Sequence, residues 1–385
     1  MKLKHIQKLT FFAALAVLFF TIPVQSQQSL QVLPRHVRSA VSGGQAALQG
    51  SLPLTQTMGL TLVLPLRNTA ALNSLLSQLY DPSSPNYHHF LSVDEFTAQF
   101  GPTAEDYQTV VNFAKANGFS VVDTPANRLI LPIGGTVAQI NTAFHVQMNN
   151  YRHPTEDRTF YSPDRDPSLN LGVPVAHIVG LDNFSLPKPM IAQPQDGQPD
   201  PLITGSGPGG TSYLGSDMRA AYYGGTTLTG TGQVVGLLEF GGYNKSDVDL
   251  TFSNAGQTYS VPVVNVLLDG ATGAATSNSA EDVLDIVQAI GLAPGLSQVR
   301  VYIGVISDAT VLNSIATENL AKQIGISWSW ATADPTADDV FFQEMAAQGQ
   351  SVFAASGDHG AFDAAISPTS IQPMTSTLRR WAEPI

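Results

Sequence analysis

The sequence predicts a protein with two folded domains, the first of the α+β class and the second an α/β domain with a parallel sheet. Three observations carry this prediction. The chain has 385 residues, a length that suggests two or three domains. Residues 27–183 mix helix and strand patterns, whereas from Tyr213 onward strand and helix patterns alternate. Such alternation is typical of a parallel sheet that is covered by helices on both faces.

The first 26 residues have the pattern of a cleaved signal peptide. Three lysines precede an apolar stretch, residues 9–24, and Val24-Gln25-Ser26 then offers a small-residue cleavage site. The alternative is a membrane anchor, but this apolar stretch is shorter than the ~20 residues that a spanning helix needs. We therefore expect a secreted or extracytoplasmic protein with no membrane span after removal of the signal.

The N-terminal domain, residues 27–183, is expected to contain several helices among short strands. Apolar residues recur at helical spacing in some stretches and form short β-type runs in others. Gly118 stands where the C-terminal cap of a helix is expected. The predicted strands are 60–66, 119–123 and 128–133, and the predicted helices are 69–79, 93–100, 104–117 and 137–144.

Residues 184–212 are predicted to be a linker between the two domains. This stretch is rich in proline, glycine and glutamine and has no hydrophobic period, which indicates an exposed connection. Exposed connections of this kind are preferred sites of proteolysis. We therefore expect a processing site within the linker.

The C-terminal domain, residues 213–385, shows the alternating pattern. In sheets of this type the active site lies at the carboxyl ends of the strands. The predicted strands are 233–240, 263–268, 298–305, 324–328 and 351–355, and the predicted helices are 280–292, 310–322 and 338–348.

Composition excludes several classes of function. The net charge of −12 argues against nucleic-acid binding, which needs a basic surface. The chain has no cysteine, so disulfides, thiolate zinc sites and cysteine nucleophiles are excluded. His359 is the one histidine after Tyr213, and too little chain follows it to supply the serine of a subtilisin-type triad. Because the sequence also lacks the G-x-S-x-G, Walker and H-E-x-x-H motifs, acid–base chemistry here must rest on carboxylates.

Three carboxylates are placed where such chemistry is possible. Glu281 and Asp285 are four residues apart, so a helix puts both on one face. The alternative interpretation is a solvated acidic stripe on an amphipathic helix. Asp358 follows a predicted buried strand and lies between glycines, where it serves either chemistry or the shape of a turn.

These segments together resemble the sedolisin family of serine-carboxyl peptidases, of the kumamolisin-like type. The resemblance implies a ferredoxin-like activation domain followed by a subtilisin-like parallel-sheet domain. The N-terminal signature begins at Leu79-Tyr-Asp-Pro-Ser-Ser-Pro-Asn-Tyr-His-His-Phe-Leu. The matching segments of the second domain are Leu237-Leu-Glu-Phe-Gly-Gly-Tyr, Glu281-x-x-x-Asp285 followed by Leu292-Ala-Pro-Gly, Ile326-Ser-Trp and Ala355-Ser-Gly-Asp-x-Gly.

The resemblance also implies a role for each matching residue. Glu281 corresponds to the general base that takes the proton of a nucleophilic serine, and Asp285 to the acid that orients this base. Asp358 corresponds to the acid that lines the oxyanion hole. Glu239 and Trp328 correspond to positions that extend the hydrogen-bond network behind the pair.

The sequence departs from the family pattern near its end. The family's serine lies in a G-T-S-x-x-x-P segment, and its calcium loop lies later still; neither occurs up to Ile385. We therefore assign no nucleophile, no calcium ligand and no other metal site in this chain, and we expect a truncated or frameshifted peptidase domain.

The expected function is that of a secreted zymogen of an acid-acting serine-carboxyl endopeptidase, inactive as written. Its substrates would be proteins or peptides, and its activation domain would pack on its own catalytic domain. The alternatives are a non-catalytic binding or inhibitory module, an inactive remnant of such a peptidase, and an unrelated hydrolase.

Overall fold

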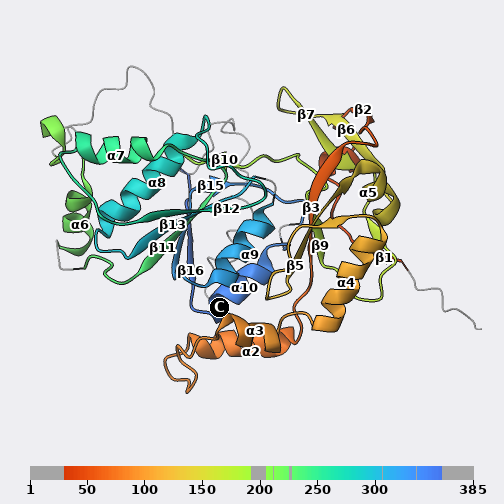
Figure 1. Cartoon of the computed structure of the whole chain (residues 1–385), viewed down its shortest axis with the longest axis horizontal. Coiled ribbons are helices and arrows are strands. Elements are labelled where there is room, and N and C mark those ends of the chain that lie inside the picture. Colours follow the sequence, from red (N-terminus) through yellow and green to blue (C-terminus); the bar gives the residue numbers. More distant parts are fainter. Residues whose placement is uncertain are drawn as a thin grey trace, which may run out of the picture.

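The structure is a computed structural model that describes residues 30–191, 205–210, 212–224, 228–305, 307–334 and 336–357. Two domains lie side by side, the N-terminal one in orange and yellow and the C-terminal one in green and blue (Figure 1). The predicted signal peptide, residues 1–26, and the candidate Asp358 lie outside the described residues. Within the described ranges, none of the helices has the length and apolar character needed to cross a membrane.

The N-terminal domain is built on a four-stranded antiparallel sheet with the order β4-β5-β3-β9. A three-stranded antiparallel sheet, β2-β6-β7, and a short β1–β8 pair complete its strands. The strands are β1 (Gln31–Val32), β2 (Leu48–Ser51), β3 (Thr57–Val63), β4 (Ser120–Val121), β5 (Ile130–Thr136), β6 (Met148–Arg152), β7 (Thr159–Pro163), β8 (Ser168–Leu169) and β9 (His177–Val179).

Three of the helices described in this domain, α3, α4 and α5, begin at a residue whose side chain caps the helix. Ser92 and Thr136 each form a capping box, and Thr103 accepts a hydrogen bond from the backbone of the first turn that follows it. Gly118 adopts φ +80° just after the fourth helix, as predicted. The helices are α1 (Ser39–Ser42), α2 (Thr69–Leu79), α3 (Val93–Gln99), α4 (Ala104–Ala116) and α5 (Val137–Phe144).

The C-terminal domain contains a five-stranded parallel sheet with the order β12-β13-β11-β14-β16. The five predicted strands are all present, whereas α6 and α7 were missed by the sequence analysis. The strands are β11 (Val234–Glu239), β12 (Val263–Leu267), β13 (Gln298–Ile303), β14 (Gln323–Ile326) and β16 (Ser351–Ala354), and a short strand, β15 (Trp328–Ser329), follows β14. The helices are α6 (Gly215–Tyr223), α7 (Lys245–Asn254), α8 (Ser279–Leu292), α9 (Asp308–Glu318) and α10 (Asp339–Ala347), with a 3-10 turn, η1 (Pro208–Gly210), before them.

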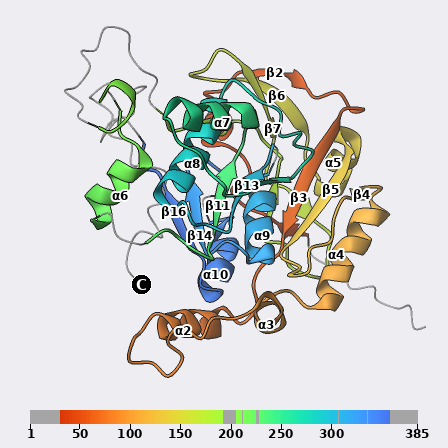
Figure 2. The ribbon, with the colours of Figure 1, turned by 60° about the vertical axis from the view of Figure 1, so that its left-hand side comes forward.

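The two faces of the parallel sheet are covered by different partners. On one face, α7 and α8 enclose a core with residues of β11 and β13. On the other face, α9 and α10 lie between the sheet and the N-terminal domain (Figure 2). The central strand β11 pairs with β13 on one side and β14 on the other, so later strands are added to the sheet on both sides of β11. Such a switch point is where α/β domains place their ligand sites.

The four-stranded sheet of the N-terminal domain is buried on both faces. Because side chains alternate along a strand, Leu60 and Leu62 of β3 enter the domain's own core with α4 and α5, while Thr61 and Val63 face the other way. Thr61 Oγ1 lies 3.3 Å from Thr310 Oγ1 of α9, and Val63 joins a core shared by both domains. The predicted packing of the first domain on the second is therefore present.

A buried polar contact lies inside this shared interface. Asn127, which has no exposed surface, reaches from the N-terminal domain between α9 and α10. Its Nδ2 donates to Asn313 Oδ1 at 2.8 Å and to Glu344 Oε2 at 2.7 Å. Burial raises the pKa of Glu344 to about 7, although its hydrogen bonds from Asn127 and Gln348 oppose this change.

The structure differs from the predicted linker at its beginning. The ring of Phe184 stacks on His153 with centroids 4.4 Å apart. A short strand, β10 (Lys188–Pro189), pairs antiparallel with β15, and Met190 N donates to Ser327 O at 2.9 Å. Sequence periodicity gave no sign of this pairing because a short backbone ladder requires no pattern of apolar side chains. The beginning of the predicted linker thus contacts other parts of the chain, although Leu186 and Lys188 are exposed.

Candidate active site

The candidate site lies where β11 and β14 end and α8 begins. Glu239 is the last residue of β11, and Trp328 opens β15 just after β14. Ser279 Oγ donates to Gly242 O at 2.7 Å and so ties the first residue of α8 to the loop that follows β11. Three carboxyl residues in the first two turns of α8, Glu281, Asp282 and Asp285, are thereby brought to the carboxyl ends of the strands.

Glu239 and Trp328 form a buried hydrogen-bonded pair. Trp328 Nε1 donates to Glu239 Oε2 at 2.5 Å, and the two residues are 1% and 0% exposed. Burial raises the pKa of Glu239 well above its ordinary value, and the nearby charges of Asp285 and Asp282 raise it further. A protonated Glu239 is therefore the favoured form, and it can donate a hydrogen bond.

Asp285 lies beside Glu239. Ser327 Oγ donates to Asp285 Oδ1 at 2.9 Å. Burial raises the pKa of Asp285, and hydrogen bonds from Ser327 and Glu239 oppose this change. Glu281, one helical turn earlier, is only 4% exposed. The alternative interpretation of these acids as a solvated stripe is therefore wrong.

Asp282 is a member of the cluster that sequence reasoning missed. It has no exposed surface, and burial raises its pKa to about 6. Its carboxyl interacts with that of Glu239, which comes from a strand distant in the sequence. The available signal was its spacing of three residues from Asp285, which puts the two side chains on neighbouring positions of a helix.

The predicted site residues are thus brought together only in part. Glu239, Asp285 and Trp328 are in contact, and Glu281 lies on the same helix one turn before Asp285. Asp358 lies outside the described residues, but Gly357 is described, and a Cβ on it would be 3.0 Å from Met190 Cε. The segment that follows β10 therefore passes next to Gly357.

No metal centre was found in the parts of the chain that the structure describes, where no three His, Asp or Glu side chains are grouped so as to hold an ion. The expectation that calcium ligands belong to a later loop stays a prediction.

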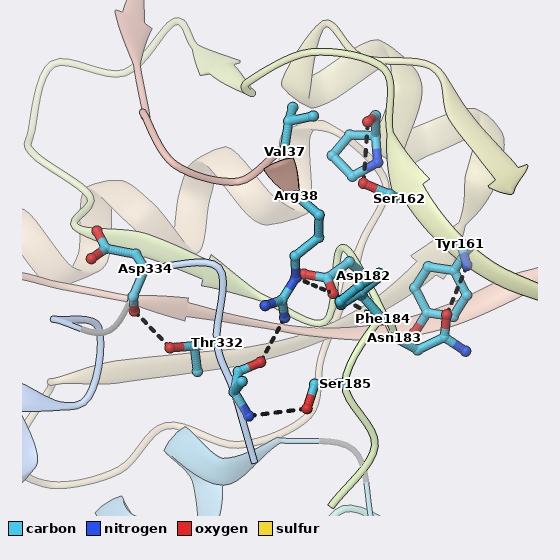
Figure 3. Close-up of polar contacts among 12 residues, drawn as sticks. Val37, Arg38, Tyr161, Ser162, Asp182, Asn183, Phe184, Ser185, Thr332 and Asp334 are labelled. Carbon is cyan, nitrogen blue, oxygen red and sulfur yellow. Dashed lines mark hydrogen bonds and ion pairs between the residues drawn. The ribbon is translucent and has the colours of Figure 1, made fainter. Parts of the chain in front are cut away.

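A second group of acids lies at the domain interface, on the other side of β15. Asp308 and Asp338 both interact with the Trp330 indole, and burial raises the pKa of each carboxyl. Arg38 of the N-terminal domain forms an ion pair with Asp182 at 2.8 Å and donates from Nη2 to Ala331 O at 2.8 Å, next to Trp330 (Figure 3). Ser185 Oγ accepts from Ala331 N at 3.1 Å, and Arg35 pairs with Asp334 at 3.1 Å.

Together the fold and the site define a class of protein: an α/β domain with a buried carboxyl cluster, docked against an α+β domain whose following strand pairs beside that cluster. Residues 44–184 match the model of the family described as "Pro-kumamolisin, activation domain". This match and the relatives below support the sedolisin family.

Three curated relatives are similar along most of the chain. Xanthomonalisin of Xanthomonas sp. (strain T-22) is 28% identical over 384 residues, which cover 90% of this chain and 46% of the relative. Kumamolisin of Bacillus sp. (strain MN-32) is 28% identical, with 89% and 64% covered. Sedolisin of Pseudomonas sp. (strain 101) is 25% identical, with 91% and 63% covered. The chain therefore spans about half to two thirds of the length of these relatives.

One solved structure also matches part of the chain. It is Pseudomonas sedolisin, a serine-carboxyl proteinase, complexed with two molecules of pseudo-iodotyrostatin. The sequence identity is 24% and the TM-score is 0.34, with 38% of this chain and 45% of that chain covered.

Proposed function

We propose that this chain represents the zymogen of a secreted, acid-acting serine-carboxyl endopeptidase that hydrolyses peptide bonds in proteins. The observation that carries the proposal is the buried contact of Glu239, Asp285 and Trp328, beside Glu281, at the carboxyl ends of the parallel strands. Carboxyl groups whose pKa values are shifted by burial and by neighbouring acids occur preferentially at functional sites. The similarity to sedolisins supports the same function.

The proposed mechanism uses carboxyl groups in place of a histidine. Glu281 accepts the proton of the attacking serine, and Asp285 holds Glu281 in the orientation for that transfer. Asp358 donates a hydrogen bond to the oxyanion, which it can do only while it is protonated. Activity should therefore be highest at acidic pH. The chain up to Ile385 offers no serine that we assign to the nucleophile, and we expect the 385-residue product itself to be inactive.

The N-terminal domain is proposed to keep the enzyme latent. Its order of strands, β4-β5-β3-β9 with antiparallel neighbours, supports the ferredoxin-like fold expected of the activation domain. Residues 188–190 pair with residues 327–329, and Pro189 lies opposite Trp328. An extended peptide adds to a strand edge in the same way. Cleavage between about Lys188 and Ser212 would then release this segment.

The test begins with the DNA beyond codon 385, read in all three frames. A frame that encodes G-T-S-x-x-x-P should give a longer protein with peptidase activity at acidic pH. In that protein Glu281→Gln and Asp358→Ala should each lower kcat by about 10²–10³, while the matched surface variant Asp247→Asn should retain full activity. A neutral optimum, or full activity of Glu281→Gln, would exclude the serine-carboxyl mechanism.

The alternative is a non-catalytic inhibitory module. The pairing of β10 with β15 favours this alternative. A segment that pairs with a strand edge of its own chain can also pair with the same edge of a related peptidase. Purified 385-residue protein should then inhibit an active sedolisin-type peptidase when the two are mixed, and a stop codon followed by unrelated DNA would support this reading.

A further inference from the structure

Three carboxyl groups lie near Trp328, those of Glu239, Asp282 and Asp285. They have more acceptor oxygens than there are hydrogen-bond donors around them. Trp328 Nε1 and Ser327 Oγ donate to one oxygen each of Glu239 and Asp285. Four buried oxygens receive no donor from the described residues: Glu239 Oε1, both oxygens of Asp282, and Asp285 Oδ2. An ionised carboxylate can only accept hydrogen bonds, so three carboxylates would leave these oxygens facing one another without a proton. Such an arrangement is costly inside a protein.

Protons held by the carboxyls themselves resolve this shortage. Like charges at such short range prevent all members of a cluster from ionising together. Glu239 occupies the middle position, because its carboxyl interacts with both Asp282 and Asp285. A proton on Glu239 therefore supplies a donor to either neighbour, and Asp282 provides an acceptor next to it.

The surroundings of Asp282 hold its carboxyl in this position. A Cβ on Gly241, two residues after Glu239, would lie 3.1 Å from Asp282 Oδ2, so a side chain at this position would press on the carboxyl. The groups that bear on its charge are Glu239 at the end of β11 and Asp285 on α8, and its own charge acts on Tyr243. No lysine, arginine or histidine takes part in the interactions of Asp282 among the described residues.

We propose that Asp282 is a positioning residue of the candidate active site: it shares the single carboxyl proton of Glu239 and so keeps Glu239 protonated beside Asp285. The catalytic meaning of this role rests on the proposed function. The sharing of the proton is a property of the 385-residue chain and can be measured without any turnover.

The indole N–H of Trp328 reports on this proton because it donates to Glu239. The chain has only three tryptophans, so its Nε1–H cross-peak can be assigned in a nitrogen–proton NMR spectrum by Trp→Phe substitution. In the unaltered chain we expect this cross-peak to titrate well above the ordinary range of a glutamate. In Asp282→Asn, the negative charge is lost and the amide can donate to an ionised Glu239. The midpoint should therefore fall by about one pH unit or more, a tenfold change in proton affinity.

Two controls separate this effect from general damage. The cross-peak of Trp330, which lies beside Asp308 and Asp338, should keep its own midpoint in Asp282→Asn. The surface variant Asp247→Asn removes a charge from α7 and should leave the Trp328 midpoint unchanged. An unchanged Trp328 midpoint in folded Asp282→Asn would overturn the proposal.

If Asp282→Asn does not fold, titration of the Trp328 cross-peak in the unaltered chain tests the proposal. Titration of the Trp328 cross-peak near the usual pKa of a glutamate, about 4.3, would overturn the proposal, and titration near or above neutrality would support it. Absence of peptidase activity in the longer protein would count against the proposed function alone.

Discussion

Two tryptophans on one short stretch of chain serve two different acid clusters. Trp328 lies with Glu239, Asp282 and Asp285, and Trp330 lies with Asp308 and Asp338. Both indoles meet the ring of Phe240 edge to face, with centroids 5.9 and 5.4 Å apart.

The difference between the clusters lies in what surrounds them. The acids around Trp328 belong to the C-terminal domain and have no cation among their partners in the described residues. Asp308 and Asp338, around Trp330, likewise have no cation among their partners in the described residues, but they face the N-terminal domain. There Arg38 pairs with Asp182 (Figure 3), and Arg35 pairs with Asp334. The same residue types therefore lie in the candidate active site in one place and at a domain contact in the other. Residue type and burial alone would not have told them apart.

The largest expected effect compares the two tryptophans. Trp328→Phe should lower the free energy of unfolding by about 3 kcal/mol, because it leaves Glu239 without its indole donor and opens a cavity. Trp330→Phe should cost about 1 kcal/mol, since Trp330 is only partly buried. Urea unfolding of both variants measures the difference, and equal losses would contradict the distinction between the clusters.

The pH dependence of stability tests whether both clusters hold protons. Burial raises the pKa of Asp282 to about 6 and that of Asp338 well above its ordinary value. The folded state therefore prefers the protonated acids. Their contribution is fully present below the unfolded pKa, near 3.8 for Asp, and is lost as pH rises through the folded pKa. Stability should thus rise from pH 7 to pH 5.

Neutral variants of the two acids should reduce this rise. Asp282→Asn and Asp338→Asn should each make the difference in unfolding free energy between pH 7 and pH 5 smaller, by on the order of 1–2 kcal/mol. Urea midpoints at the two pH values provide the measurement. A pH dependence identical to that of the unaltered chain would show that the substituted acid is ionised in both states.

The smallest expected effect concerns two histidines beside the second cluster. The rings of His36 and His177 stack with centroids 3.9 Å apart, and burial lowers the pKa of both. His36 Nε2 accepts from Ile178 N at 3.0 Å, so a proton there would break this bond. Asp166 and Asp334 oppose the lowered pKa of His36, and Arg38 and Arg35 add to that of His177.

A lowered histidine pKa gives the opposite sign from the raised acids. Its contribution is present above the unfolded pKa, 6.5, and is lost as pH falls through the folded pKa. His36→Gln keeps an acceptor for Ile178 N, so it should remove about 1 kcal/mol of acid sensitivity. The exposed His89→Gln serves as the matched control, and thermal unfolding between pH 7 and pH 4 is the measurement. Equal behaviour of the two variants would contradict a role for the stacked pair.

The sequence predicted the helix faces and strands, because these depend on residues that are close together along the chain. The spacing of Glu281 and Asp285 put them on one helix face, and five strand patterns located the parallel sheet. The sequence could not show that Asp282 meets Glu239, because that contact depends on how α8 packs on the end of β11. The pairing of β10 with β15 was hidden for a similar reason, since it consists of backbone hydrogen bonds.

The buried amide of Asn127 bears on how the two domains find a single relative position. An interface made only of leucine, valine and phenylalanine tolerates small slips, because one apolar contact replaces another at little cost. A shift of one domain on the other would leave Asn127, Asn313 and Glu344 buried without their hydrogen-bond partners, at a cost of several kcal/mol. The hydrogen bonds of the Asn127 side chain therefore favour one relative position of the docked domains. Docking in this position also brings residues 188–190 into register with β15.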